Sequence, residues 1–152
     1  VHTNSAIGTV SRLLDMGTPG YLLASSLLAI VAQRLVRRVC SHCAEPYQPD
    51  PIQQAWLDSV RHDLDLGGLR IGRGCNRCGN SGYRGRVGVY ELLELNGVMA
   101  AALRKDDHEE FTRAALASNQ FTPLWQSVLG YAAQGVTSLS EAIRISGDVE
   151  SD

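Results

Sequence analysis

Four cysteines, arranged as two pairs of the form Cys-x-x-Cys, are the residues of this sequence best suited to chemistry. Cys40 and Cys43 form the first pair, and Cys75 and Cys78 form the second. Tetrahedral zinc takes four ligands, at about 2.3 Å when they are thiolates, and one Cys-x-x-Cys turn supplies two of them. Two such turns complete the shell. The spacing therefore predicts one zinc ion held by all four thiols.

The residues beside the cysteines support this interpretation. Gly74 precedes the second pair and Gly79 follows it, and glycine gives a tight turn access to left-handed backbone conformations. Four thiolates around one divalent cation leave a local charge of about −2, which nearby arginines can offset. The arginines that flank the pairs in sequence are Arg37, Arg38, Arg73, Arg77, Arg84 and Arg86. A shell of four thiolates has no open position for water, so the predicted zinc is structural and not catalytic.

Two other uses of the cysteines stay open at this point. A redox Cys-x-x-Cys motif normally needs a single pair that opens a helix in a β-α-β setting. Two disulfides need an oxidising compartment, and nothing in the sequence indicates secretion. Both hypotheses fit the pattern less well than structural zinc does.

The histidines are weaker candidates for chemistry. His42 lies between two cysteines and could compete for the metal, but with four thiols available we interpret it as an exposed turn residue. His62 and His108 have polar neighbours and are typical of surface residues. His2 stands in the polar stretch HTN, and on its own it is typical of a strand-end histidine with satisfied hydrogen bonds.

Composition indicates a globular protein of modest size. The chain has 152 residues, of which 44% are hydrophobic and 20% charged, with a net charge of −2. This length allows one core, or one core with a small metal-stabilised appendage. The longest apolar run, from Tyr21 to Val36, is shorter than the roughly 20 residues of a spanning helix, so we predict no membrane span. The opening VHTNSAIG has neither an initiator methionine nor a signal-peptide pattern, and we expect a piece of a longer polypeptide.

Arginines are concentrated in the middle of the chain. Nine of the thirteen lie between Arg34 and Arg86. This cluster is compatible with our alternative hypothesis, a zinc-ribbon module that binds nucleic acid. The hypothesis is weakened because aromatic residues are not interleaved with the arginines and the net charge is not basic.

The first part of the chain has the periodicity of helices. Asn4 and Ser5 can cap a helix whose apolar residues recur at spacings of one, three and four, and the residues 17–19 end it. A second, longer helix is predicted from about residue 20 to the region of Val36, because leucines and alanines occupy nearly all sides of its first half.

The rest of the chain combines short strands with further helices. Prolines between residues 40 and 51 mark a boundary. Capping boxes formed by Asp106 with Glu109 and by Ser138 with Glu141 are expected to start two of the later helices. The elements predicted after the boundary are a short helix at 51–60, strands at 67–74 and 86–95, and helices at 111–118, 123–135 and 142–146.

Several motifs, in one order, together resemble a known family. They are VHTNSA, RLLDMG, LLASSLLAIVAQRLVRRVC, CSHC, GCNRCGNSGYRGRVGVYELL and QGVTSLSEAIRIS. In this order and at these separations they resemble the C-terminal part of the secretion ATPases that power type II secretion and type IV pilus assembly. The resemblance covers nearly the whole chain, and the combination is specific.

The resemblance implies an α+β, mainly helical fold in three parts. Residues 1–38 would be the C-terminal end of a RecA-like α/β ATPase core, 39–92 a tetracysteine zinc-binding subdomain, and 93–152 a C-terminal helical subdomain. His2 would be the histidine-box residue, with a supporting role near the nucleotide phosphates of the parent ATPase. The four cysteines match the family's zinc-holding motif.

The resemblance also implies the working context. The family acts as a cytoplasmic homohexamer, docked on the inner membrane through platform and adaptor proteins, with ATP and Mg²⁺ bound in the full-length parent. These 152 residues contain no GxxxxGK[ST] phosphate loop and no acidic Walker B strand. We therefore expect the fragment alone not to be catalytic, and to serve structural, subunit-contact and partner-docking roles.

Overall fold

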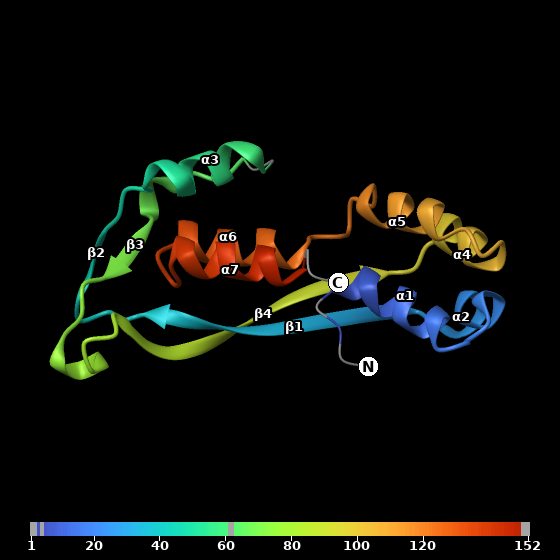
Figure 1. Ribbon diagram of the computed structural model, residues 1–152, viewed down its shortest axis with the longest axis horizontal. Helices are drawn as coiled ribbons and strands as arrows, with labels where there is room; N and C mark the ends of the chain where they lie inside the picture. Colours follow the sequence, from blue (N-terminus) through green and yellow to red (C-terminus); the bar gives the residue numbers. More distant parts are fainter. Residues whose placement is uncertain (1–2, 4, 61–62, 150–152) are drawn as a thin grey trace. The chain divides into compact units, whose positions relative to one another are not determined.

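The computed structural model describes residue 3 and residues 5–60 and 63–149 (Figure 1). The chain folds into two compact units. Of the described residues, unit 1 contains those up to 32 and those from 90 to 123, and unit 2 contains those from 33 to 89 and from 124 to 149. Two long strands, β1 (Ala29–Val39) and β4 (Tyr83–Glu94), pair with one another and run in opposite directions. Each strand has one end in each unit, so each unit is assembled from separate stretches of sequence.

Unit 1 consists of four helices beside its share of the two strands. The helices are α1 (Ala6–Asp15), α2 (Gly20–Ser26), α4 (Gly97–Arg104) and α5 (His108–Leu116). Fully buried members of its core include Val10, Leu93, Met99, Leu103 and Phe111. Burial of such side chains contributes about 1.5–3 kcal/mol each, which makes this core the main stabilising element of the unit.

The start and the end of α1 have clear local causes. Ser5 is the N-cap, and its hydroxyl accepts a hydrogen bond from the N–H of Gly8 at 3.0 Å. The buried carboxylate of Glu91, on β4, accepts a second bond from the N–H of Ala6 at 2.6 Å. Gly17 then ends the helix with φ 90°, a left-handed conformation that glycine adopts without a side-chain penalty. The predicted cap at Ser5 and the predicted stop are confirmed.

Unit 2 contains the remaining elements. They are β2 (Ala44–Pro46), α3 (Pro51–Ser59), η1 (Leu66–Gly68), β3 (Arg70–Gly72), η2 (Asn76–Cys78), α6 (Leu124–Ala133) and α7 (Leu139–Val149). β2 and β3 are antiparallel, with Glu45 opposite Ile71. The buried core includes Val36, Leu57, Val89, Leu129 and Ile145. The strands and helices predicted at 51–60, 67–74, 86–95 and 123–135 correspond to α3, β3, β4 and α6.

α3 shows how the proline-rich boundary starts a new helix. Asp50 accepts a hydrogen bond from the N–H of Gln53, whose side chain accepts one from the N–H of Asp50. Pro51 occupies the first helical turn, where a missing N–H removes no helix hydrogen bond. On the inner side of α3, Trp56 meets Trp125 of α6 edge to face, with 6.3 Å between ring centroids.

The predicted long helix up to Val36 is wrong. α2 ends at Ser26, and residues 29–39 form β1. From 29 to 36 the burial along β1 alternates, with Ile30, Ala32 and Val36 buried and the odd-numbered residues exposed, which is the period of a half-buried strand. Pairing with β4 satisfies the backbone of this stretch, and β-branched residues favour a strand. This tertiary pairing overrides the helical propensity of the leucines and alanines.

The capping box expected at Asp106 is wrong by one residue. The N-cap of α5 is Asp107, whose carboxylate accepts from the N–H of Glu110 at 2.9 Å. Asp106 instead has φ 53° and closes the end of α4. The expected box at Ser138 is half present, because its hydroxyl accepts from the N–H of Glu141 at 3.3 Å while the Glu141 carboxylate binds elsewhere.

The fold class is mixed helix and strand, with more helix than strand. Of the helices in the described part of the chain, none has the length and apolar character needed to cross a membrane.

Candidate metal centre

The four cysteines converge on one point in unit 2. Their Sγ atoms all lie within 4.8 Å of one another. Cys40 is 3.9 Å from Cys75, Cys43 is 3.9 Å from Cys78, and Cys75 is 3.7 Å from Cys78, measured between sulfurs. A tetrahedral zinc with bonds of about 2.3 Å places its sulfurs about 3.8 Å apart. The donor set and its spacing fit a tetrahedral metal ion.

Two tight turns present the thiols. In the first turn, which follows the last residue of β1, the N–H of Cys43 donates to the carbonyl of Cys40 at 3.2 Å. In the second, at η2, the N–H of Cys78 donates to the carbonyl of Cys75 at the same distance. Gly79 follows with φ 60° and ends this turn in a left-handed conformation. The predicted need for glycine after the second pair is therefore met.

A close backbone crossing locks the two turns together. The N–H of Cys40 donates to the carbonyl of Gly82 at 2.9 Å. The N–H of Gly82 donates to Cys78 Sγ at 3.3 Å, so one glycine bonds to both turns. A Cβ atom on Gly72 would collide with the Gly82 carbonyl oxygen, and one on Gly82 would collide with that of Gly72. Only glycine at both positions allows this approach.

The electrostatic environment of the thiols is uneven. Cys40 and Cys43 are buried, and Cys75 and Cys78 are partly exposed. Burial raises the pKa of the Cys43 thiol to about 12, because the charged form loses water. Burial also acts against the Cys78 thiolate, but hydrogen bonds from the N–H groups of Cys75 and Gly82 outweigh it and lower its pKa to about 6. Such amide-to-sulfur bonds are typical of thiolates that hold a metal.

The geometry does not favour the two other uses of the cysteines. All four thiols are free, and the three sulfur–sulfur distances given above, 3.7–3.9 Å, are well beyond the roughly 2.05 Å of a disulfide bond. The second pair lies in a short 3-10 turn between β3 and β4, and not at the start of an α-helix in a β-α-β unit.

The histidines stand apart from the thiol cluster, as far as the structure describes them. His42 is exposed, and its Nε2 lies 3.3 Å from a guanidinium nitrogen of Arg77. His108 is the exposed first residue of α5, in unit 1. The predictions for His2 and His62 fall on residues outside the described part of the chain.

A buried carboxylate that sequence reasoning did not select lies elsewhere in unit 2. Glu141, on α7, is 1% exposed and accepts hydrogen bonds from the backbone N–H of Arg37 at 2.8 Å and from its guanidinium at 2.9 Å. Arg144 binds the same carboxylate at 3.2 Å. The Arg37 guanidinium also lies 4.1 Å from the centre of the Tyr83 ring. Arg37 therefore pairs with Glu141 and is not a free counter-charge for the thiols.

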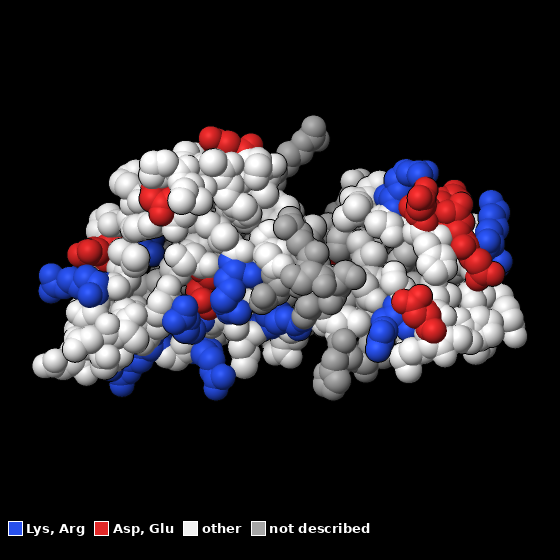
Figure 2. Space-filling view, in the orientation of Figure 1, with Lys and Arg blue, Asp and Glu red and all other residues white. Residues whose placement is uncertain are grey.

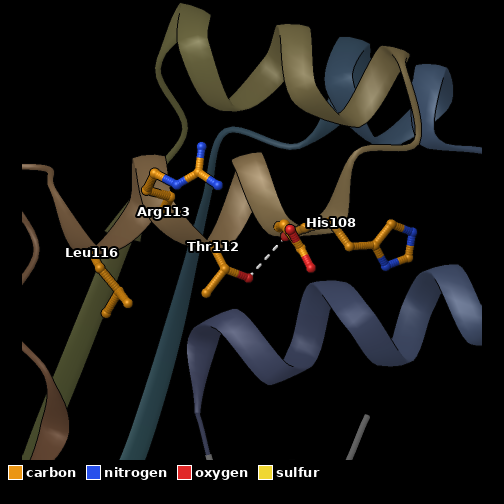
Figure 3. Close-up of a pocket in the computed structure, with 5 residues that line it drawn as sticks. His108, Thr112, Arg113 and Leu116 are labelled. Carbon is orange, nitrogen blue, oxygen red and sulfur yellow. Dashed lines mark hydrogen bonds between the residues drawn. The ribbon is translucent and has the colours of Figure 1, made fainter.

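A depression on α5, in unit 1, lacks the features of a catalytic site. Its volume is about 500 Å³, and its described lining includes His108, Thr112, Arg113 and Leu116 (Figure 3). The Thr112 hydroxyl donates to the carbonyl of His108, in its own helix, at 3.0 Å. Arg113 points to the opposite side from Thr112 and Leu116. No base is bonded to a nucleophile among these residues, so the thiol cluster is the stronger candidate site.

Comparisons with known proteins give a consistent result. Residues 1–144 match a family model described as type II/IV secretion system protein. The chain is 39% identical to a type II secretion system protein E of Pectobacterium carotovorum, over 95% of this chain and 28% of the relative. It is 38% identical to the type II secretion system ATPase E of Vibrio cholerae, with the same two coverages. It is 35% identical to the type IV pilus assembly ATPase PilB of Pseudomonas aeruginosa, over 97% of this chain and 26% of the relative. The chain thus spans less than a third of the length of these relatives.

Proposed function

This chain belongs to the family of type II/IV secretion system proteins, and we propose that it is the zinc-binding C-terminal portion of an ATPase that powers type II secretion or type IV pilus extension. The observation that carries the proposal is the convergence of four thiols at tetrahedral spacing in a chain of this family. The relatives named as ATPases support the activity of the parent protein.

In this proposal the portion does not itself hydrolyse ATP. The phosphate loop and the acidic strand that hold ATP and Mg²⁺ are absent from its sequence. Residues 1–38 are the end of a RecA-like core, and His2 takes part near the nucleotide in the parent. The remaining residues contact neighbouring subunits of a homohexamer, or platform and adaptor proteins at the inner membrane.

Zinc has a mechanical role in this proposal. Cys40, Cys43, Cys75 and Cys78 hold it, and binding of zinc to such sites contributes on the order of 10 kcal/mol of folding free energy. The segment around the thiols has short strands and few buried side chains, so cross-linking by the metal keeps it rigid. A rigid segment can transmit the movement of one subunit to the next protein.

Metal content tests the zinc site directly. Freshly purified protein is expected to contain one zinc per chain by elemental analysis. The double variant Cys75→Ser/Cys78→Ser is expected to contain none, and its amide NMR signals from residues 40–90 should lose their dispersion. His42→Ala, which changes the first turn without removing a thiol, is the matched control and should keep its zinc. Native protein with no tightly held metal would contradict the proposal.

The role in the motor is tested in a full-length ATPase that carries this portion. The same double variant should lower secretion or pilus extension while leaving nucleotide binding intact, because the phosphate loop lies in other residues. Full transport by a zinc-free variant would contradict the mechanical role.

The nucleic-acid hypothesis is not favoured. On the face shown in Figure 2 the cationic side chains of unit 2 form separate groups with uncharged surface between them. Arg37 and Arg144 are engaged by Glu141. A phosphate-driven complex must weaken steeply as salt rises, and failure to bind nucleic acid at low salt would dismiss this alternative.

A further inference from the structure

A second pocket, which lies in unit 2, is next to the first Cys-x-x-Cys turn. Its volume is about 350 Å³, and it is bordered by the end of β1, by Ser41 of the turn, by β3 and by the turn between α6 and α7. Arg38 and Arg70 line it together with Gln134. No carboxylate is among the described residues of its lining. The pocket is therefore cationic and rich in hydrogen-bond donors.

Backbone hydrogen bonds fix the walls of this pocket. At the end of α6 the N–H of Gly135 donates to the carbonyl of Ala132 at 2.9 Å, and the N–H of Val136 donates to that of Tyr131 at 3.0 Å. This pair of bonds is the Schellman motif, which holds the turn in one conformation. The carbonyl of Val136 then accepts a bond from the N–H of Val39 at 3.0 Å, which ties the turn to β1. The pocket is thus formed before any ligand arrives.

Both arginine stems pack close to glycines, and Gly135 leaves room for that of Arg70. A Cβ on Gly135 would lie 2.9 Å from Cδ of Arg70, so the stem of Arg70 passes directly over this glycine. The Cδ of Arg38 lies 3.9 Å from the corresponding position at Gly85. Packing of the stems restricts the side chains, and less rotamer entropy is then lost when their heads bind a ligand.

Neither guanidinium has a partner in the part of the chain that the structure describes. Within the described residues, Arg38 and Arg70 make no ion pair and no side-chain hydrogen bond, whereas Arg37 and Arg144 both bind Glu141. Arginine has five N–H donors in a planar fork that matches the oxygens of a phosphate group. Two arginines in the lining of one pocket, with no partner among the described residues, indicate a site for an anion.

We propose that this pocket binds a phosphate group, with Arg38 and Arg70 as its two charged ligands and Ser41 and Gln134 as further donors. The volume exceeds that of inorganic phosphate, so a small ester such as a nucleoside monophosphate also fits. Because Ser41 stands between two zinc-holding cysteines, a bound phosphate contacts the first thiol turn and stiffens it.

The zinc-loaded 152-residue chain is titrated with inorganic phosphate and, separately, with a nucleoside monophosphate. Saturable amide NMR shifts are expected at residues 38–44 and 134–136, with a dissociation constant on the order of 1 mM or below for inorganic phosphate. Arg38→Gln and Arg70→Gln should each weaken binding by about tenfold or more, because each removes a charged donor pair. Tighter binding of the ester than of phosphate would show that the ligand is an organic phosphate, and equal binding that it is the free ion.

Arg84→Gln is the matched control, because it removes the same charge from an exposed arginine that does not line the pocket. It should bind phosphate as the unchanged protein does. Equal weakening by all three variants would mean general charge attraction and would overturn the proposal. The proposal would also be overturned if the unchanged protein showed no saturable shifts and both Arg38→Gln and Arg70→Gln lost their zinc. These arginines would then serve the thiolates alone.

Discussion

Arg37 and Glu141, which are 104 positions apart, are joined by both backbone and side-chain hydrogen bonds. The backbone N–H of Arg37 donates to one carboxylate oxygen at 2.8 Å, and its guanidinium donates to the other at 2.9 Å. The carbonyl of Arg37 accepts a bond from the hydroxyl of Thr137 at 2.6 Å. These bonds attach β1 to the start of α7, on the same strand that leads to Cys40. The pair therefore positions the strand that carries the first zinc-binding turn.

The stability of unit 2 should fall in acid. Hydrogen bonds from Arg144 and Arg37 outweigh the effect of burial and lower the pKa of Glu141 to about 2, from an ordinary value of 4.5. A carboxylate whose pKa is lowered by folding contributes stability above the unfolded pKa and loses it as the pH falls toward the folded one. The loss should lie between about pH 5 and pH 2 and reach at most about 3 kcal/mol.

Tryptophan fluorescence can measure this effect selectively. Both tryptophans of the chain, Trp56 and Trp125, lie in unit 2 and contact one another. Urea unfolding followed by their emission should give a midpoint that falls with pH in this window. The variant Glu141→Gln should show a smaller fall, and an unchanged pH dependence in this variant would contradict the assignment to Glu141.

Replacement of Arg37 should cost more than replacement of Arg144. Arg37→Ala removes two guanidinium bonds and the stacking on Tyr83, and leaves a buried carboxylate with fewer donors. We expect the free energy of unfolding to fall by about 2–3 kcal/mol, because the buried carboxylate keeps Arg144 and the backbone N–H of residue 37 but loses two charged hydrogen bonds. Arg144→Ala removes longer bonds, at 3.2–3.3 Å, and should cost about 1 kcal/mol. Equal losses in urea unfolding at neutral pH would show that the stacking and the shorter bonds do not matter.

The Arg37–Glu141 pair also shows why part of this site could not be predicted from the sequence. Local patterns correctly predicted that the four thiols could share one ion, because two Cys-x-x-Cys turns carry their own geometry. A contact between residues 104 positions apart has no local signal. Sequence reasoning placed Glu141 in a capping box and Arg37 near the thiols, and the structure shows that they bind each other.

The same contrast applies to the secondary structure. α3 and α6 carry their boundary signals in their own residues, with prolines at the start and a glycine after the end of α6, and both were predicted. β1 depends on its pairing with β4, about fifty residues later, so its leucines and alanines indicated a helix instead. The identity of the metal and the division at residues 38 and 92 stay predictions.

The crossing of Gly72 and Gly82 should be intolerant of any side chain. In Gly82→Ala the new Cβ would collide with the Gly72 carbonyl, and φ of 78° is unfavourable for alanine. We expect the free energy of unfolding to fall by roughly 3 kcal/mol or more. Zinc should also bind more weakly, because Gly82 bonds to both thiol turns. Gly79→Ala is the control: its φ is 60° but its Cβ would meet nothing within 4 Å, so it should cost only about 1 kcal/mol. Competition with a zinc indicator dye measures both affinities, and equal effects would contradict the steric argument.

Two adjacent aspartates in unit 1 should respond to substitution with opposite signs. Asp106 follows α4 and has a φ of 53°. The N–H of Asp106 donates to the carbonyl of Leu103, and that of Asp107 donates to the carbonyl of Ala102. These bonds form a Schellman motif, in which the left-handed position is held by a residue other than glycine. A left-handed conformation is strained for aspartate, and Asp106→Gly removes this strain. The greater entropy of glycine in the unfolded chain offsets part of the gain, so the net stabilisation of unit 1 should be about 0.5–1 kcal/mol.

Asp107→Ala, in contrast, removes the N-cap of α5 and should destabilise the unit by about 1 kcal/mol. Amide hydrogen exchange of α4 and α5 measures both effects without depending on the tryptophans of unit 2, and should show slower exchange in the first variant and faster exchange in the second. If both substitutions accelerated exchange, the Asp106 carboxylate would have a stabilising role that outweighs the strain at its backbone.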